Sequence, residues 1–230
     1  MLGPDHLDTL TTRHELAYWH GEAGDAASAA AAFEQLLTDR LRVLGPDHPD
    51  TLATRHELAY WRGWAGDVGD AAAAFELLLP DRLRVLGPDH PATLSTRKKL
   101  ARSRGEAGDP AGAAAATEEL VLDLLRVLGP DHPDTLNTRQ HLVYWWGHAG
   151  DPANAAAAFE QLLSDQLRVL GPDHPDTLAT RHELARWRGE AGDPAGAAAA
   201  FEELALDQLR VLGPDHPENL KTRHEGDGLG

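Results

Sequence analysis

Thirteen histidines are the residues of this sequence that most suggest metal or acid–base chemistry. Six of them end the pentapeptide Leu-Gly-Pro-Asp-His, which recurs every 42 residues from Leu2 to Leu212, so successive copies stand too far apart to share one ion. Within one repeat, His174 and His182 have no carboxylate beside them at a known ligand spacing. The chain has no cysteine and no His-Glu-x-x-His motif. We therefore predict no specific metal site.

Catalytic motifs are missing from the sequence as well. It contains neither a Gly-x-x-x-x-Gly-Lys-Ser/Thr phosphate loop nor a Gly-x-Ser-x-Gly nucleophile elbow. Its carboxylates fall on faces expected to be solvated, where no raised pKa is predicted. We expect a protein that is not an enzyme and that needs no cofactor.

Binding chemistry is indicated by three positions at which the repeated copies differ most. A spacing of four residues places the three positions on one face of a helix. Tyr, Trp, Arg and His at such a face are typical of binding hot spots, so the sequence predicts a partner-binding surface there. The alternative is surface variation without a ligand. The first position reads His14, His56, Lys98, Gln140 and His182, the second Tyr18, Tyr60, Arg102, Tyr144 and Arg186, and the third Glu22, Trp64, Glu106, His148 and Glu190.

The fixed period predicts the architecture that must carry this surface. A period of 20 to 50 residues is typical of repeat arrays, in which each copy packs only against its neighbours. We expect an all-α, right-handed α-solenoid of five helix-turn-helix repeats with a short C-terminal partial repeat. The predicted bounds are 2–43, 44–85, 86–127, 128–169 and 170–211 for the repeats, 212–225 for the partial repeat and 226–230 for a flexible tail.

Each repeat reads as two helices, as the fifth copy illustrates. Gly171 suits the residue after a helix end, and Pro175 suits a first helical position, with Asp173 or His174 near the cap. The first helix is predicted over 175–191 with Leu184, Trp187 and Ala191 on its buried face, and the second over 194–212. In the second helix, the expected buried positions are Ala197, Ala198, Phe201, Leu204, Ala205, Leu209 and Leu212, and Asp207 is expected to pair with Arg210.

A hairpin with Leu184-Ala185 in its first helix, Gly192-Asp193 at its turn and Ala197-x-x-x-Phe201 in its second resembles a tetratricopeptide repeat. The 42-residue length and the linker resemble the repeats of kinesin light chains and of bacterial arrays attached to STAND-type NTPase regulators. The resemblance implies that the first helices line a concave surface, where ligands of the family usually bind. In place of the family's tyrosine, the sequence has a tryptophan one position earlier, which we expect to fill the same space between helices.

Positions that stay the same are expected to serve the scaffold. Arg13 and Asp39, with their equivalents, are predicted to form a charge ladder between neighbouring hairpins. The glycine equivalent to Gly21 in every first helix is predicted to allow close approach of a neighbouring helix, or else to floor an open ligand groove. The third repeat has Ser103 in place of the tryptophan and Thr117 in place of the phenylalanine, so we expect it to be the most loosely packed.

The net charge of −16 argues against binding to nucleic acid or to anionic membranes. No apolar run is long enough to span a bilayer, no signal peptide is recognisable and no cysteine is present, which favours the cytoplasm. We predict a protein-interaction module for a protein or peptide partner. Two alternatives stay open: a self-assembling or designed scaffold that forms homo-oligomers through uncapped ends, and a sensor segment of a larger STAND-type NTPase.

Overall fold

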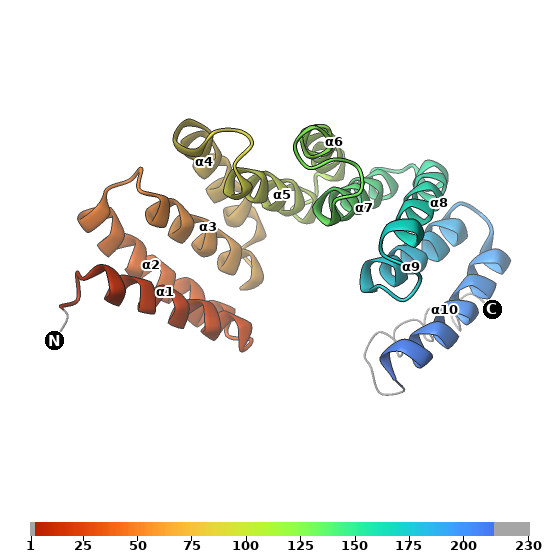
Figure 1. Cartoon of the computed structure of the whole chain (residues 1–230), viewed down its shortest axis with the longest axis horizontal. Coiled ribbons are helices and arrows are strands. Elements are labelled where there is room, and N and C mark those ends of the chain that lie inside the picture. The colour runs from red at the N-terminus through yellow and green to blue at the C-terminus, as the bar shows by residue number, and fades with distance from the viewer. Residues whose placement is uncertain (1–2, 214–230) are drawn as a thin grey trace. The chain divides into compact units, whose positions relative to one another are not determined.

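The computed structural model describes residues 3–213, and the regular structure of this part of the chain is entirely helical. The rest of the predicted partial repeat and the tail, from residue 214 on, lie outside the described residues. Ten helices form five consecutive pairs (Figure 1). They are α1 (Leu7–Glu22), α2 (Ala26–Leu44), α3 (Pro49–Trp64), α4 (Val68–Leu86), α5 (Pro91–Glu106), α6 (Pro110–Val127), α7 (Pro133–His148), α8 (Pro152–Val169), α9 (Pro175–Glu190) and α10 (Pro194–Leu212).

The helices pack in chain order within two compact units, Met1–Ala116 and Thr117–Gly230, which divide inside α6. In the first unit, each helix from α1 to α4 contacts the helix that follows it in the chain. In the second unit, α7 to α10 do the same. The first helices of successive hairpins also contact each other: α1 contacts α3, α3 contacts α5, and α7 contacts α9. This is the predicted all-α fold of helix-turn-helix repeats.

The repeated pentapeptide is the joint that ends one hairpin and starts the next. Gly45 and its equivalents end the second helices with φ between 84° and 88°, a region that only glycine adopts without strain. The following histidine is the N-cap, and its Nδ1 accepts a hydrogen bond from the backbone N–H two residues later, at 3.1 to 3.2 Å. Proline occupies the first helical position of α3, α5, α7 and α9. These residues explain why helix bounds were predictable to within one residue in the fifth repeat.

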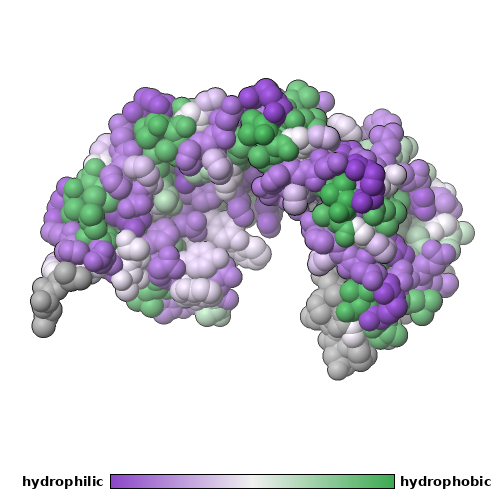
Figure 2. Space-filling model, viewed as in Figure 1, coloured by the Kyte–Doolittle hydropathy of each residue, from purple (hydrophilic) through white to green (hydrophobic). Residues whose placement is uncertain are grey.

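The core of each hairpin is built from positions that are alike in nearly every copy, except that the third repeat buries Thr117 in place of the phenylalanine. Phe33, Phe75, Phe159 and Phe201 of the second helices are fully buried, and so are the alanines that let the paired helices approach closely. Ala191 was predicted to be buried, but it is the exposed C-cap residue of α9. Asp207 and Arg210 pair at 3.3 Å, as expected. On the face shown in Figure 2, hydrophobic residues lie in separate patches among hydrophilic ones.

The charge ladder was assigned to the wrong contact. The ion pair of Arg13 with Asp39, at 2.7 Å, joins the two helices of one hairpin, and three equivalent pairs lie between 2.6 and 2.8 Å. Ion pairs between successive hairpins involve other residues: Arg62 with Glu34 at 3.1 Å, Arg104 with Glu76 at 2.6 Å and Arg188 with Glu160 at 2.5 Å. Both sets are partly exposed, so each pair contributes at most about 1 kcal/mol.

Candidate binding site on the first helices

The first of the three variable positions is buried or half-buried and does not form a binding surface in the described residues. His56 is 7 % exposed and His182 is 5 % exposed, and each ring packs edge-on against a core phenylalanine, Phe75 or Phe201. His14 is half-buried in the same way against Phe33. Lys98 and Gln140 are half-buried too. Buried in this way, the rings of His56 and His182 face into the hairpin and offer little surface to the partner that we predict for them.

His56 belongs to a polar network around a buried arginine, and His14 lies 3.3 Å from the equivalent Arg40. The Arg82 guanidinium, which is 4 % exposed, lies 3.2 Å from His56 Nδ1 and donates to Thr96 Oγ1 and to the backbone carbonyls of Ala92 and Leu52. Burial, and then the neighbouring Arg82, lowers the pKa of His56 to about 3. A neutral His56 can accept a hydrogen bond from Arg82, whereas a protonated one cannot. This position serves the scaffold.

The second and third variable positions do reach solvent, and in the first unit they come together. Trp64, on α3, is 55 % exposed, and Tyr60 is half-buried one turn earlier, with the two ring centroids 6.2 Å apart. From α5, the Arg102 guanidinium lies 5.7 Å from the Trp64 ring and pairs with Glu106 at 2.6 Å. On α1, Tyr18 is half-buried and Glu22 is exposed. The centre of the Tyr18 ring lies 6.1 Å from that of Trp61.

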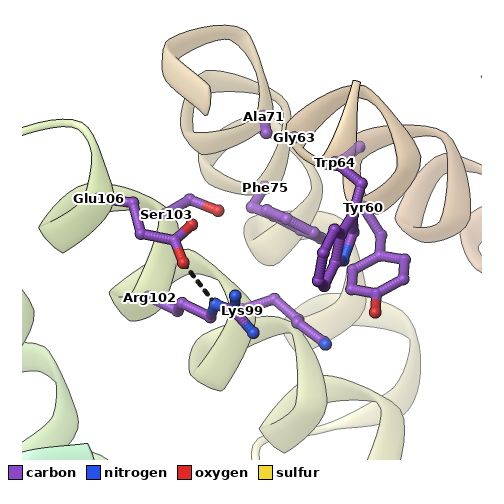
Figure 3. Close-up of a pocket in the computed structure, with 10 residues that line it drawn as sticks. Tyr60, Gly63, Trp64, Ala71, Phe75, Lys99, Arg102, Ser103 and Glu106 are labelled. Atoms are coloured by element: carbon purple, nitrogen blue, oxygen red, sulfur yellow. Dashed lines mark hydrogen bonds and ion pairs between the residues drawn. The ribbon is translucent and has the colours of Figure 1, made fainter. Parts of the chain in front are cut away.

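A pocket of about 220 Å³ opens between α3 and α5 beside these residues (Figure 3). Its floor is Gly63, with Ala71 and the ring of Phe75 behind it, and Tyr60 and Trp64 form one wall. Lys99, Arg102, Ser103 and Glu106 line the opposite side from α5. The pocket therefore combines three aromatic rings with two cations and one carboxylate.

The second unit has a related cluster on α7 and α9. His148 and Tyr144 stack with ring centroids 4.1 Å apart, and Arg186 lies 3.2 Å from His148 Nε2. The same guanidinium lies over the Trp187 ring at 4.4 Å. Glu190 is exposed at the end of α9. Here the space between the first helices is filled by Trp187, which is 5 % exposed.

Lys99 is a residue that the sequence comparison missed. Its ammonium lies 4.0 Å from the centre of the Tyr60 ring, and burial lowers its pKa. It lies one position beyond the first variable position, where the copies read Glu15, Glu57, Lys99, His141 and Glu183. This change of charge is visible in the sequence, but position 99 does not share the four-residue spacing that relates the three variable positions. The pocket itself results from a missing side chain, that of the tryptophan replaced by Ser103.

Among residues 3–213, no group of three or more His, Asp or Glu side chains could hold a metal ion. None of the described helices combines the length and the apolar character that crossing a membrane requires.

Comparison with known families matches the repeated hairpins directly. One tetratricopeptide repeat model matches residues 9–50 and 51–92, and a second matches residues 147–205, together more than half of the chain. The chain belongs to the tetratricopeptide repeat family. A comparison of its sequence with curated proteins finds no match.

Solved tetratricopeptide repeat structures extend the likeness to nearly the whole chain. The nearly identical TPR-like repeats of a kinesin-light-chain-type protein from Podosopora anserina are 27 % identical, with a TM-score of 0.79 over 93 % of this chain and 100 % of that one. A second structure of these repeats is 28 % identical, with a TM-score of 0.77 over 91 % and 98 %. BtubC (BKLC) from P. vanneervenii shares the fold at 19 % identity, with a TM-score of 0.74 over 91 % and 83 %. The kinesin-light-chain-like type of repeat is thus confirmed.

Proposed function

We propose that this chain is a non-catalytic protein-interaction module that binds a peptide or protein segment along the exposed ends of its first helices. Tetratricopeptide repeats generally act as protein-interaction scaffolds, which supports the class of function. The observation that carries the proposed face is Trp64, an indole 55 % exposed beside Tyr60 and Arg102. Large aromatic side chains and arginine dominate the energetics of protein interfaces.

The variable positions supply the contacts in each unit separately. In the first unit, Tyr60 and Trp64 offer apolar surface and Arg102 offers a cation. In the second unit, Tyr144 and His148 offer the ring surface and Arg186 offers the cation. The buried histidines of the first variable position hold the helices in place without touching the partner. The partner therefore reads one or two residues per hairpin, as a repeat scaffold with variable surface positions permits.

A peptide selection on the intact chain tests this proposal. Peptides selected from a random library are measured by titration calorimetry against the intact chain and against a triple variant, Tyr60→Ala, Trp64→Ala and Tyr144→Ala. We expect at least about a tenfold loss of affinity, since each aromatic anchor is worth more than 1 kcal/mol. Leu77→Ala is the matched control, because the Leu77 side chain is 73 % exposed on the second helix α4 and does not line the pocket beside Trp64. Equal loss in the control, or no loss in the triple variant, would refute the proposed face.

Self-association is a second candidate, favoured by one specific observation. Trp19 has the position in its repeat that Trp61 and Trp187 have in theirs, yet it is 64 % exposed, with Leu16 beside it 58 % exposed. A second copy of the chain could cover this surface of α1. Sedimentation equilibrium over a hundredfold range of concentration tests it, with Trp19→Lys as the comparison. A monomer at every concentration would rule this candidate out.

A further inference from the structure

Successive first helices meet at a glycine, and in two places an indole ring covers that glycine. A Cβ placed on Gly21 would lie 2.5 Å from three ring atoms of Trp61, and one on Gly147 would lie 2.5 to 2.6 Å from three ring atoms of Trp187. Trp61 is 4 % exposed and Trp187 is 5 % exposed. We call the space between such a glycine and the next first helix the indole slot. In these two slots, the chain supplies the ring itself.

The slot over Gly63 is built in the same way but is open. The residue equivalent to Trp61 and Trp187 is Ser103, whose side chain leaves the pocket of about 220 Å³. A Cβ on Gly63 would meet only the Cβ of Ala71, at 3.2 Å. The glycine that accommodates an indole elsewhere is therefore kept here, while the indole is absent. Figure 3 shows the open space between Phe75 and Trp64 on one side and the α5 side chains on the other.

The rim of the open slot also differs from the filled slots in charge. Four residues before the tryptophan, the filled slots have Glu57 and Glu183, whereas the open slot has Lys99. The Lys99 ammonium contacts the Tyr60 ring, and among the described residues it has no carboxylate at ion-pair distance. Arg102 stands beside it, partly neutralised by Glu106 at 2.6 Å. Compared with the two filled slots, this rim position has a cation in place of a carboxylate, with Glu57 and Glu106 as the acidic groups that act on Lys99.

We propose that the open slot over Gly63 binds a small free aromatic acid, a planar ring of indole size that carries a carboxylate on a short side chain. The ring lies on Gly63 against Phe75, Tyr60 and Trp64, where the chain's own indole lies in the other slots. The carboxylate meets the Lys99 ammonium, with Arg102 next to it. Because Lys99 and Ser103 are four residues apart on α5, a single small molecule reaches both the slot and the cation.

This small-molecule site goes beyond the proposed function and does not depend on it. A chain that binds the aromatic acid but no peptide would keep this inference and refute the interaction module. A chain that binds peptides through Trp64 but no aromatic acid would do the reverse. The two proposals are therefore tested separately on the same intact protein.

Titration calorimetry with indole-3-propionate as the probe tests the site. For a molecule of this size we expect a Kd at or below about 1 mM. Ser103→Trp, which fills the slot with the ring found in the other repeats, abolishes binding, and circular dichroism checks that this variant is folded. Lys99→Glu gives this position the carboxylate found in the filled slots. It lowers the affinity for indole-3-propionate at least about tenfold and leaves the affinity for uncharged indole unchanged.

Trp187→Ser is the matched variant in the second unit. It opens the slot over Gly147 while keeping Glu183 at the rim, so we expect it to add a site for indole but none for indole-3-propionate. Unsaturable binding of indole-3-propionate by the intact chain would overturn the proposal. So would binding that survives Ser103→Trp, or a Lys99→Glu variant that binds indole-3-propionate as well as the intact chain does.

Discussion

Replacing Gly21 by alanine tests the indole slot as a structural device. Alanine is normally the better helix former by about 1 kcal/mol, so the change should stabilise an ordinary helix. Here the new Cβ would lie 2.5 Å from three ring atoms of Trp61, a distance that real Cβ atoms essentially never show. The buried indole must shift, and with it the contact between α1 and α3.

The expected size of the effect follows from two opposing terms. Overpacking a buried contact costs about 1 to 3 kcal/mol, and the helix gain offsets about 1 kcal/mol of it. We therefore expect Gly21→Ala to lower the free energy of unfolding by up to about 2 kcal/mol. Gly63→Ala is the matched control, since its Cβ meets only Ala71, at 3.2 Å. That contact is tight but involves no ring, so this variant should change the free energy of unfolding less than Gly21→Ala does.

Urea unfolding followed by circular dichroism at 222 nm measures both variants. In a Trp61→Ser background, which recreates the open slot, Gly21→Ala should cost little, and the cycle through both single variants should give a coupling free energy of about 1 to 3 kcal/mol. Equal unfolding midpoints for Gly21→Ala and Gly63→Ala would show that the Trp61 ring does not exclude a Cβ at position 21. So would a cost that persists after the ring is removed.

Three further predictions concern other parts of the scaffold. Ser103→Trp should raise the free energy of unfolding by about 1 to 3 kcal/mol by burying an indole in the open slot, and a lower urea midpoint would contradict this. Because the pKa of His56 is about 3 in the folded chain and near 6.5 when unfolded, the unfolded state binds the extra proton between these values, so stability should fall as the pH drops below 6.5, with a slope that approaches about 1.4 kcal/mol per pH unit near pH 5. His56→Gln, which copies the fourth repeat, should flatten that slope in urea unfolding at each pH, and an unchanged slope would assign it to other groups. Arg62→Met should cost less than about 1 kcal/mol at low salt and nothing at 1 M NaCl, because its pair with Glu34 is partly exposed, and a larger, salt-independent loss would show a packing role.

The helices were predictable because each boundary is marked by a residue with one physical use. Proline at a first helical position, a capping histidine and a glycine with positive φ recur at every joint, so the period fixes the bounds. The phenylalanine and alanine positions of the core repeat for the same reason. Packing of a hairpin depends on its own pattern, and the sequence contains that pattern in full.

The binding surface was only partly predictable, because variation does not measure exposure. The position of His56 varies among the copies, yet His56 itself is buried in a polar network with Arg82 and Thr96. The partners of Arg13 could not be assigned either, because the spacing alone fits a contact within one hairpin as well as one between hairpins. The pocket is caused by Ser103, and the effect of a missing side chain depends on what surrounds it in three dimensions.

A crystal structure of the Ser103→Trp variant tests most directly whether the candidate site is an indole slot left open. We predict that the new indole lies flat on Gly63 and is buried to the same extent as Trp61 on Gly21, so that the pocket disappears. An indole turned out to solvent, with the space over Gly63 still open, would contradict the account.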